Sequence, residues 1–182
     1  MIGLRELKAG DAPGVRRIYS GPSLRFLGRG PMGADEATAY IAEATARSAD
    51  RPRLRYTLGV DVEGELVAII KLNVINGEGH LSYIVRHDTW GRSIATCAVT
   101  ELLAFAFDAL SLSTVRAKHR VGNRASGRVL LKSGFTQTGT AGGFAHYGKV
   151  RRQVPAPSDA VHVRDGAPVT GRPHGGFAML AT

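Results

Sequence analysis

Apolar residues in the middle of the chain follow first a strand pattern and then a helix pattern. The stretch Gly79–Arg86 is rich in β-branched and aromatic residues and is bounded by glycine and by His-Asp, which predicts a strand. From about Ile94 to Leu110 the apolar residues recur every three to four positions, which predicts a long amphipathic helix. A short turn, Trp90–Thr96, therefore joins the strand to the helix. Two adjacent stripes carry the apolar positions of the helix: Ile94, Ala98, Leu102 and Ala106, and Ala95, Val99, Leu103 and Phe107.

The turn between these two elements has the properties of an anion-binding site. Backbone N–H groups at a helix start have no intrahelical partner, and they carry the positive end of the helix dipole. Arg92 adds a full positive charge beside them. A phosphate or pyrophosphate is the ligand that suits such a helix start. Because many strand–turn–helix units look alike, this pattern alone is a weak indication.

The remaining chain alternates between β-rich runs and helical segments. Asp11 is the expected N-cap of a first helix, Glu63-Gly64 the turn of a hairpin, and Gly134 the residue that ends the last helix. Further strands are predicted at residues 1–7, 54–62, 66–74, 113–119, 135–138 and 144–150, and further helices at residues 13–19, 35–48 and 123–133.

The order of these elements predicts a mixed sheet. Residues 54–62, 66–74 and 79–86 form an antiparallel meander, because short turns join them. The long helix then crosses over and places residues 113–119 parallel to residues 79–86. Parallel strands on either side of a helix start can splay apart, which would leave backbone groups free between them.

An ordered series of residues runs through this region. It comprises Tyr83, Trp90, Gly91, Arg92, Ala95, Thr96, Phe107, Asn123, Ser126, Arg128, Val129, Leu130, Gly134 and Phe135. The series resembles the cofactor-binding region of the GNAT acetyltransferases, in the branch of the ribosomal-protein-alanine N-acetyltransferases and their antibiotic-modifying relatives. Two positions depart from the wider family: Ser93 replaces a glycine of the turn, and Leu130 replaces a tyrosine that often protonates the leaving thiolate.

The resemblance implies a fold and a domain boundary. The fold is α+β (α/β), with a mostly antiparallel central sheet of six to seven strands, a parallel splayed pair in its middle and about four flanking helices. The acetyltransferase domain covers residues 1–150. Residues 151–182 are rich in Pro, Gly and Ala and lack a sustained period, so we expect a mobile tail there.

The resemblance also assigns acetyl-CoA as the cofactor and places its parts. The pyrophosphate lies on the turn, and the pantetheine arm pairs with one strand as an added strand would. Asn123 and Ser126 contact the pantetheine amides and the sulfur, respectively. The cofactor-binding residues are therefore Tyr83, Ile84, Val85, Trp90, Gly91, Arg92, Ser93, Ile94, Ala95, Thr96, Asn123 and Ser126.

The implied chemistry is direct acetyl transfer to an amine, which must be neutral because an ammonium has no lone pair. His80 is the candidate base, since relatives often place Glu at this position and an imidazole changes charge near neutral pH. A histidine satisfied by a backbone carbonyl is the structural alternative. His119 and Glu78 are the other candidate bases, and Ser126 takes the role near the sulfur. No metal ion is expected.

The composition and net charge indicate which kinds of molecule the protein binds. The chain has 182 residues, 43% of them hydrophobic, so it can bury a core by itself, and its net charge of +9 favours anionic partners over polycations. A solvated arginine-rich surface explains the charge equally well. We expect a cytoplasmic monomer or homodimer, without a signal peptide, membrane span or nucleic-acid motif. Acidic residues could attract cationic amines locally: Glu36, Glu43, Asp61 and Glu63.

The acceptor amine stays open at this stage. A peptide N-terminus and a small-molecule amine, as in antibiotic self-resistance or biosynthesis, make the same chemical demand. A non-catalytic acyl-CoA-binding module is a further alternative. The glycine-rich and proline-rich segment 20–33 contains Leu24, Phe26 and Leu27, which either pack on the core or form a wall of the acceptor cleft.

Overall fold

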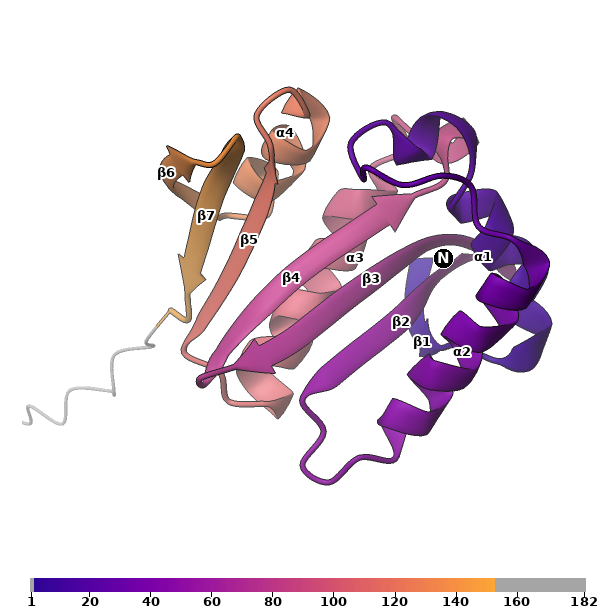
Figure 1. The fold of residues 1–182 in the computed structure, drawn as a ribbon. Helices are drawn as coiled ribbons and strands as arrows, with labels where there is room; N and C mark the ends of the chain where they lie inside the picture. The colour runs from indigo at the N-terminus through magenta and orange to yellow at the C-terminus, as the bar shows by residue number, and fades with distance from the viewer. Residues whose placement is uncertain (1, 153–182) are drawn as a thin grey trace, which may run out of the picture. The chain divides into compact units, whose positions relative to one another are not determined.

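A computed structural model describes residues 2–152 and shows one seven-stranded sheet in the order β1-β2-β3-β4-β5-β7-β6 (Figure 1). All neighbouring strands are antiparallel except β4 and β5, which are parallel. The mixed sheet with a central parallel pair is thus confirmed. The strands are β1 (Ile2–Glu6), β2 (Arg55–Val62), β3 (Glu65–Ile75), β4 (Glu78–Val85), β5 (Thr114–Arg120), β6 (Thr136–Ala141) and β7 (Phe144–Val150).

Helices cover both faces of this sheet (Figure 1). Helix α3 lies behind the sheet in this view, and α1 and α2 lie on the opposite face. A π-helical segment, Phe105–Ala109, prolongs α3 to nearly the predicted length. The helices are α1 (Ala12–Ile18), α2 (Ala34–Ser48), α3 (Ile94–Ala104) and α4 (Arg124–Lys132).

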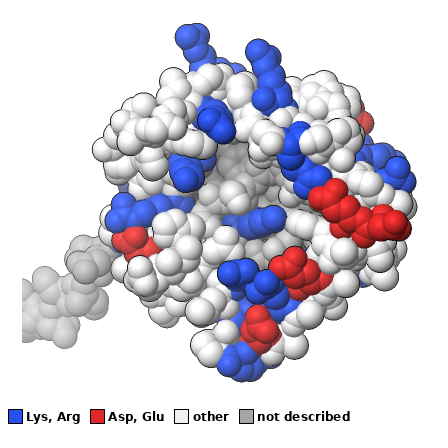
Figure 2. Space-filling view, viewed as in Figure 1, with Lys and Arg blue, Asp and Glu red and all other residues white. Residues whose placement is uncertain are grey.

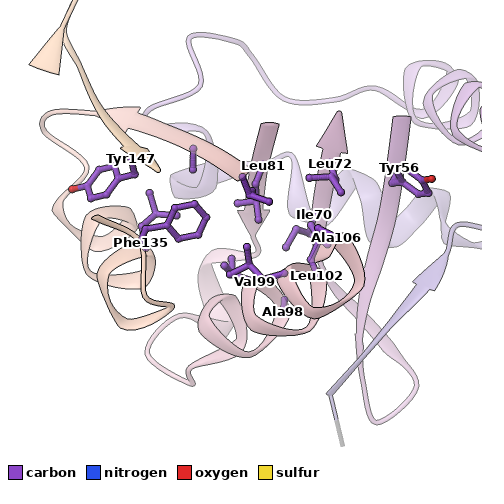
Figure 3. Close-up of a cluster of buried hydrophobic side chains, with 14 of the residues drawn as sticks. Tyr56, Ile70, Leu72, Leu81, Ala98, Val99, Leu102, Ala106, Phe135 and Tyr147 are labelled. Carbon is purple, nitrogen blue, oxygen red and sulfur yellow. The ribbon is translucent and has the colours of Figure 1, made fainter. Parts of the chain in front are cut away.

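Two hydrophobic cores hold the layers together. The larger one lies between the sheet and α3, where Leu102 and Ala106 pack against Ile70 and Leu72 (Figure 3). The smaller one joins α1 and α2 to the other face, and Ile69 contributes to it from β3. Burying side chains on both faces explains why residues 66–70 of β3 form a continuous apolar run.

The parallel pair separates after a few residues. Gly79, His80 and Leu81 of β4 pair with residues 115–117 of β5, and the pairing ends there. Beyond this point β4 stays with β3, whereas β5 stays with β7 through to Arg120. The two strands therefore splay, as the sequence predicts, and they leave the facing edge of β4 open.

Local signals correctly predict the hairpin turn and the end of α4. Glu63 and Gly64 both have positive φ (53° and 87°), as a type I′ turn requires. Helix α4 ends with the N–H of Phe135 donating to Leu130 O and the N–H of Gly134 to Leu131 O, both at 3.0 Å. Gly134 has φ +80°, so this is a Schellman motif.

The predicted capping role of Asp11 is wrong. Asp11 stands at the N-cap position of α1, but its carboxylate makes no hydrogen bond to that helix. The carboxylate instead accepts hydrogen bonds from the Lys8 N–H at 2.8 Å and from the Arg5 guanidinium at 2.7 and 2.9 Å. These partners bind the segment before α1 to β1, which takes the side chain away from the helix.

Within residues 2–152, no helix combines the length and the apolar character that a membrane crossing needs. The tail expected over residues 151–182 lies outside the described residues from residue 153 onward.

Candidate active site

The turn after β4 exposes several backbone donors. Gly91 has φ +80°, and Ser93 at the N-cap of α3 has φ 58° and ψ 8°, a left-handed conformation. The Ser93 side chain makes no capping hydrogen bond. Because α3 begins at Ile94, the N–H groups of its first turn point out of the helix without an intrahelical acceptor. The turn thus has the free donors and the positive dipole end that an anion needs.

The Trp90 side chain binds the end of β4 and also lines the cavity beside the turn. Its indole N–H donates a 2.9 Å hydrogen bond to the Val85 carbonyl, and its ring packs edge-on against His87. The predicted role of Trp90 in contacting the cofactor stays a prediction. The structure adds a second role, because this bond fixes the strand end from which the turn departs.

The backbone of β4 presents alternate residues to the open gap. The N–H of Arg86 donates to Val67 O on β3, so even-numbered residues direct their backbone groups toward β3. Tyr83 and Val85 therefore direct theirs toward the splay. The Ile84 backbone faces β3, and its side chain is buried in the smaller core. An extended ligand would find its hydrogen bonds at Tyr83 and at the Val85 N–H.

A cavity of about 620 Å³ connects the turn to the splay. Its walls include Tyr83–Val85 on β4, residues 89–96 of the turn, and Asn123–Ser126 at the start of α4. The basic residues Arg92 and Arg128 also line it. Free amides, positive charge and an open strand edge suit the phosphates and the amide-bearing arm of CoA, so the residues present fit this cofactor.

The start of α4 is tied to β4 beside this cavity. The Asn123 side chain caps α4, because its Oδ1 accepts a hydrogen bond from the Ser126 N–H at 3.2 Å. The Tyr83 hydroxyl donates to the Ser126 carbonyl at 3.3 Å. Burial raises the pKa of Tyr83 to about 12, so the hydroxyl stays protonated and keeps this bond. The predicted contacts of Asn123 and Ser126 with the cofactor stay predictions, and both residues line the cavity.

A second cavity of about 510 Å³ adjoins the first. Tyr83, Ser126 and Phe26 line both cavities, so the two meet at the splay. His80, the candidate base, lines the second cavity and not the first. In β4 it lies one residue before Leu81, whose pairing with Ala117 is the last before the strands separate. The predicted role of His80 as the base stays a prediction.

The other two candidate bases differ in their surroundings. Glu78 forms a bidentate ion pair with Arg116, in which Nη2 donates to Oε1 at 2.8 Å. This pairing lowers the pKa of the Glu78 carboxyl below its usual value. A carboxylate held charged in this way is a weaker proton acceptor. His119 contacts Arg120 O through Nδ1 at 2.7 Å and the Tyr147 hydroxyl through Nε2 at 3.2 Å. Since a carbonyl only accepts, Nδ1 carries a proton. The Tyr147 hydroxyl also lies within hydrogen-bond distance of Gln137 Oε1, at 3.3 Å, so two acceptors compete for its one proton when His119 is neutral.

The segment after α1 contributes to both the core and the site. Leu24 is buried in the smaller core, as the structural alternative predicts. Phe26 and Leu27 line both cavities, as the cleft-wall alternative predicts. The segment thus packs on the core through Leu24 and contributes Phe26 and Leu27 to the walls of the site.

Neither cavity is lined by a carboxylate from the described part of the chain. Three of the four acidic residues that were expected to attract a cationic amine form ion pairs elsewhere, and the fourth, Glu63, lines neither cavity. Glu36 pairs with Arg29 and Glu43 with Arg47, both on α2 or next to it. Asp61 on β2 forms an ion pair with Arg5 on β1, at the edge of the sheet away from the cavities. Among the described residues, Glu78 alone forms an ion pair with a cation that lines a cavity, Arg116, and it does not line the cavity itself.

Sequence reasoning missed the basic side of the second cavity. Lys118, Arg120 and Phe144 line it, and none of them was a candidate. The signal was present as an alternation of basic residues with smaller ones along residues 115–120. Assigning that alternation to a face requires the strand order, which the sequence alone does not give.

The fold and the site agree with the comparisons to known proteins. Residues 2–136 match the family model of the acetyltransferase (GNAT) domain. The chain belongs to this family of acetyltransferases.

Its curated relatives include the uncharacterized N-acetyltransferase YoaA of Bacillus subtilis (strain 168), 24% identical over 141 residues, 75% of this chain and 80% of the relative. Among solved structures, Mycobacterium smegmatis RimJ in complex with CoA-disulfide has a TM-score of 0.72 at 21% identity, over 85% of this chain and 84% of that chain. The aminoglycoside acetyltransferase AAC(6′)-Ib in complex with coenzyme A has a TM-score of 0.69 at 15% identity, over 83% and 95%. These structural likenesses establish the fold.

Proposed function

We propose that the protein transfers an acetyl group from acetyl-CoA directly to a primary amine. The observation that carries the proposal is the meeting of two cavities at the β4–β5 splay, one lined by the phosphate-type turn and the other by His80. Support comes from family membership and from the CoA complexes of RimJ and AAC(6′)-Ib.

Acetyl-CoA, when bound, supplies an activated acyl group as a thioester. The N–H groups of residues 91–96 and the Arg92 guanidinium hold the diphosphate. The open backbone of Tyr83 and Val85 pairs with the pantetheine amides, as an added strand does. An N–H of this edge is also the donor available to stabilise negative charge at the thioester carbonyl oxygen.

The acceptor enters through the second cavity. His80 takes a proton from the ammonium form of the acceptor, directly or through one water, which leaves the neutral amine. The amine lone pair attacks the thioester carbonyl, the N–C bond forms, and the C–S bond breaks to release CoA as the thiolate. Ser126 lies at the junction of the cavities and donates a hydrogen bond near the sulfur. The protein thus orients both reactants and moves the proton, and it needs no covalent intermediate of its own.

Two acceptor classes meet this demand: a peptide or protein N-terminus, and a small-molecule amine such as an antibiotic or a biosynthetic intermediate. Polycationic amines are disfavoured, because the cavities lack described carboxylates and carry several Lys and Arg residues. The peptide N-terminus or a weakly cationic amine is therefore the better fit.

The test is thiol release from acetyl-CoA in the presence of N-terminal peptides and small amines, with mass spectrometry of the acetylated product. We expect turnover with at least one neutral or acidic acceptor and a mass gain of one acetyl group. Tight CoA binding without transfer to any amine would contradict the proposal and favour a non-catalytic acyl-CoA-binding module.

A further inference from the structure

The acceptor cavity has a basic wall that the transfer chemistry does not use. Its side chains come from β5, where Val115 and Ala117 face the larger core. The alternation of a strand then places Arg116, Lys118 and Arg120 on the opposite face, and all three line the second cavity. Figure 2 shows a hollow on the viewed face of the molecule, with Lys and Arg side chains around it.

The three cations of this wall are not equivalent. Arg116 is neutralised by its ion pair with Glu78. Within residues 2–152, Lys118 and Arg120 have no carboxylate within ion-pair distance. Both instead lie over the ring of Phe144, with Nζ of Lys118 at 4.9 Å and Cζ of Arg120 at 4.6 Å from its centroid. Two cations without a described carboxylate partner thus contact the same aromatic ring in a concave site.

Such an arrangement favours an anion on the incoming molecule. Clustered charges of one sign in a cleft raise the local concentration of the opposite charge, and charge-assisted hydrogen bonds strengthen its binding. We propose that the acceptor is a primary amine that also carries a carboxylate or phosphate, and that Lys118 and Arg120 bind this anionic group. The inference rests on the proposed function and adds the substrate class.

The residue spacing along β5 indicates how far the amine of the acceptor should lie from its carboxylate or phosphate. His80 pairs with Arg116, and Lys118 and Arg120 follow two and four residues later. At about 3.3 Å per residue, they lie roughly 7 and 13 Å farther along the strand. A peptide with Asp or Glu at its second or third position spans this distance, as does a short anionic amine. Both sources share the same chemistry.

The experiment compares matched acceptors with acetyl-CoA. One pair is a peptide with Glu at positions 2 and 3 against the same peptide with Gln there. The other pair is 6-aminohexanoate against its amide. We expect kcat/KM to be at least about tenfold higher for the anionic member of a pair, mostly through KM, and the ratio to shrink with added salt. The pair with the larger ratio identifies the source, peptide or small molecule.

Variants assign the preference to residues. Lys118→Gln and Arg120→Gln should each reduce the ratio several-fold, and Arg120→Glu should favour the neutral member. Arg16→Gln is the matched control, because Arg16 is an exposed cation on α1 outside both cavities. It should keep the ratio unchanged. Melting curves check that each variant is folded.

Three outcomes would overturn the inference. Equal rates on both members of each pair would overturn it and leave the proposed function standing. Loss of CoA affinity in Lys118→Gln or Arg120→Gln would also overturn it, because the two cations would then serve the cofactor phosphates. Absence of transfer to every amine would overturn the proposed function and this inference together.

Discussion

The indole N–H of Trp90 donates a hydrogen bond to the carbonyl of Val85 across the turn that ends β4. This bond joins the open edge of the strand to the anion-binding turn, although the Trp90 side chain is 53% exposed. The sequence pattern places Trp90 in the cofactor motif but does not show that it closes the strand end. Loss of this hydrogen bond should therefore weaken the binding of CoA at the turn.

Trp90→Phe keeps the aromatic ring and removes the donor. A hydrogen bond contributes about 1 kcal/mol, so we expect the dissociation constant for CoA to rise about fivefold. The melting temperature should change little, because the side chain is half exposed. His87→Ala is the control, since it removes the ring contact and keeps the hydrogen bond. Unchanged CoA affinity in Trp90→Phe, by calorimetric titration, would show that the bond does not organise the turn.

Ser93 adopts the left-handed conformation that glycine adopts without cost. Ser93→Gly should relieve strain of about 1 kcal/mol, partly offset by the greater freedom of glycine in the unfolded chain. Ser93→Val should lower the free energy of unfolding by 1 kcal/mol or more, because a β-branched residue is poorly accommodated at positive φ. Urea unfolding measures both variants. A more stable valine variant would contradict the strain that we assign to this residue.

His80→Gln tests the predicted base. Glutamine keeps a polar side chain of similar reach but cannot take a proton from the amine. We expect kcat/KM at neutral pH to fall by about 10²-fold or more, as for the loss of a general base, and the acid limb of the pH–rate profile to disappear. CoA affinity is the control measurement and should stay the same. A profile of unchanged shape would exclude His80 and favour His119.

Asp11 makes stability depend on pH. Burial alone would raise the pKa of Asp11, but the hydrogen bonds from Arg5 and Lys8 outweigh it and lower the pKa below the usual value. A carboxyl whose pKa is lower in the folded state stabilises the fold above its unfolded pKa, and this contribution is lost as the pH falls through the folded value. Stability should therefore fall as the pH drops below about 4.

Asp11→Asn should remove part of this dependence. At pH 7 we expect a loss of about 1–3 kcal/mol in the free energy of unfolding, since hydrogen bonds to a charged group are lost. The difference between the two proteins should shrink as the pH falls through the acidic range. Urea unfolding at several pH values measures this. Parallel stability curves for the two proteins would contradict the assignment.

The sequence predicts the elements that depend on local signals. Gly134 marks the end of α4 because a left-handed C′ residue needs glycine, and Glu63-Gly64 marks a hairpin for a similar reason. The parallel placement of β5 beside β4 follows from the crossover helix. Features that depend on several segments are harder to predict. The side chain of Asp11 follows Arg5 and Lys8 rather than its own helix, and Lys118 and Arg120 face the cavity only because β5 lies between β4 and β7.

Calorimetric titration with CoA tests the central claim most directly, since every step depends on the turn at residues 91–96 holding the diphosphate. We expect saturable binding at micromolar concentrations, at least tenfold weaker binding of pantetheine, which lacks the diphosphate, and weaker CoA binding by Arg92→Gln. Equal affinity for CoA and pantetheine, or no heat of binding with CoA, would contradict the account.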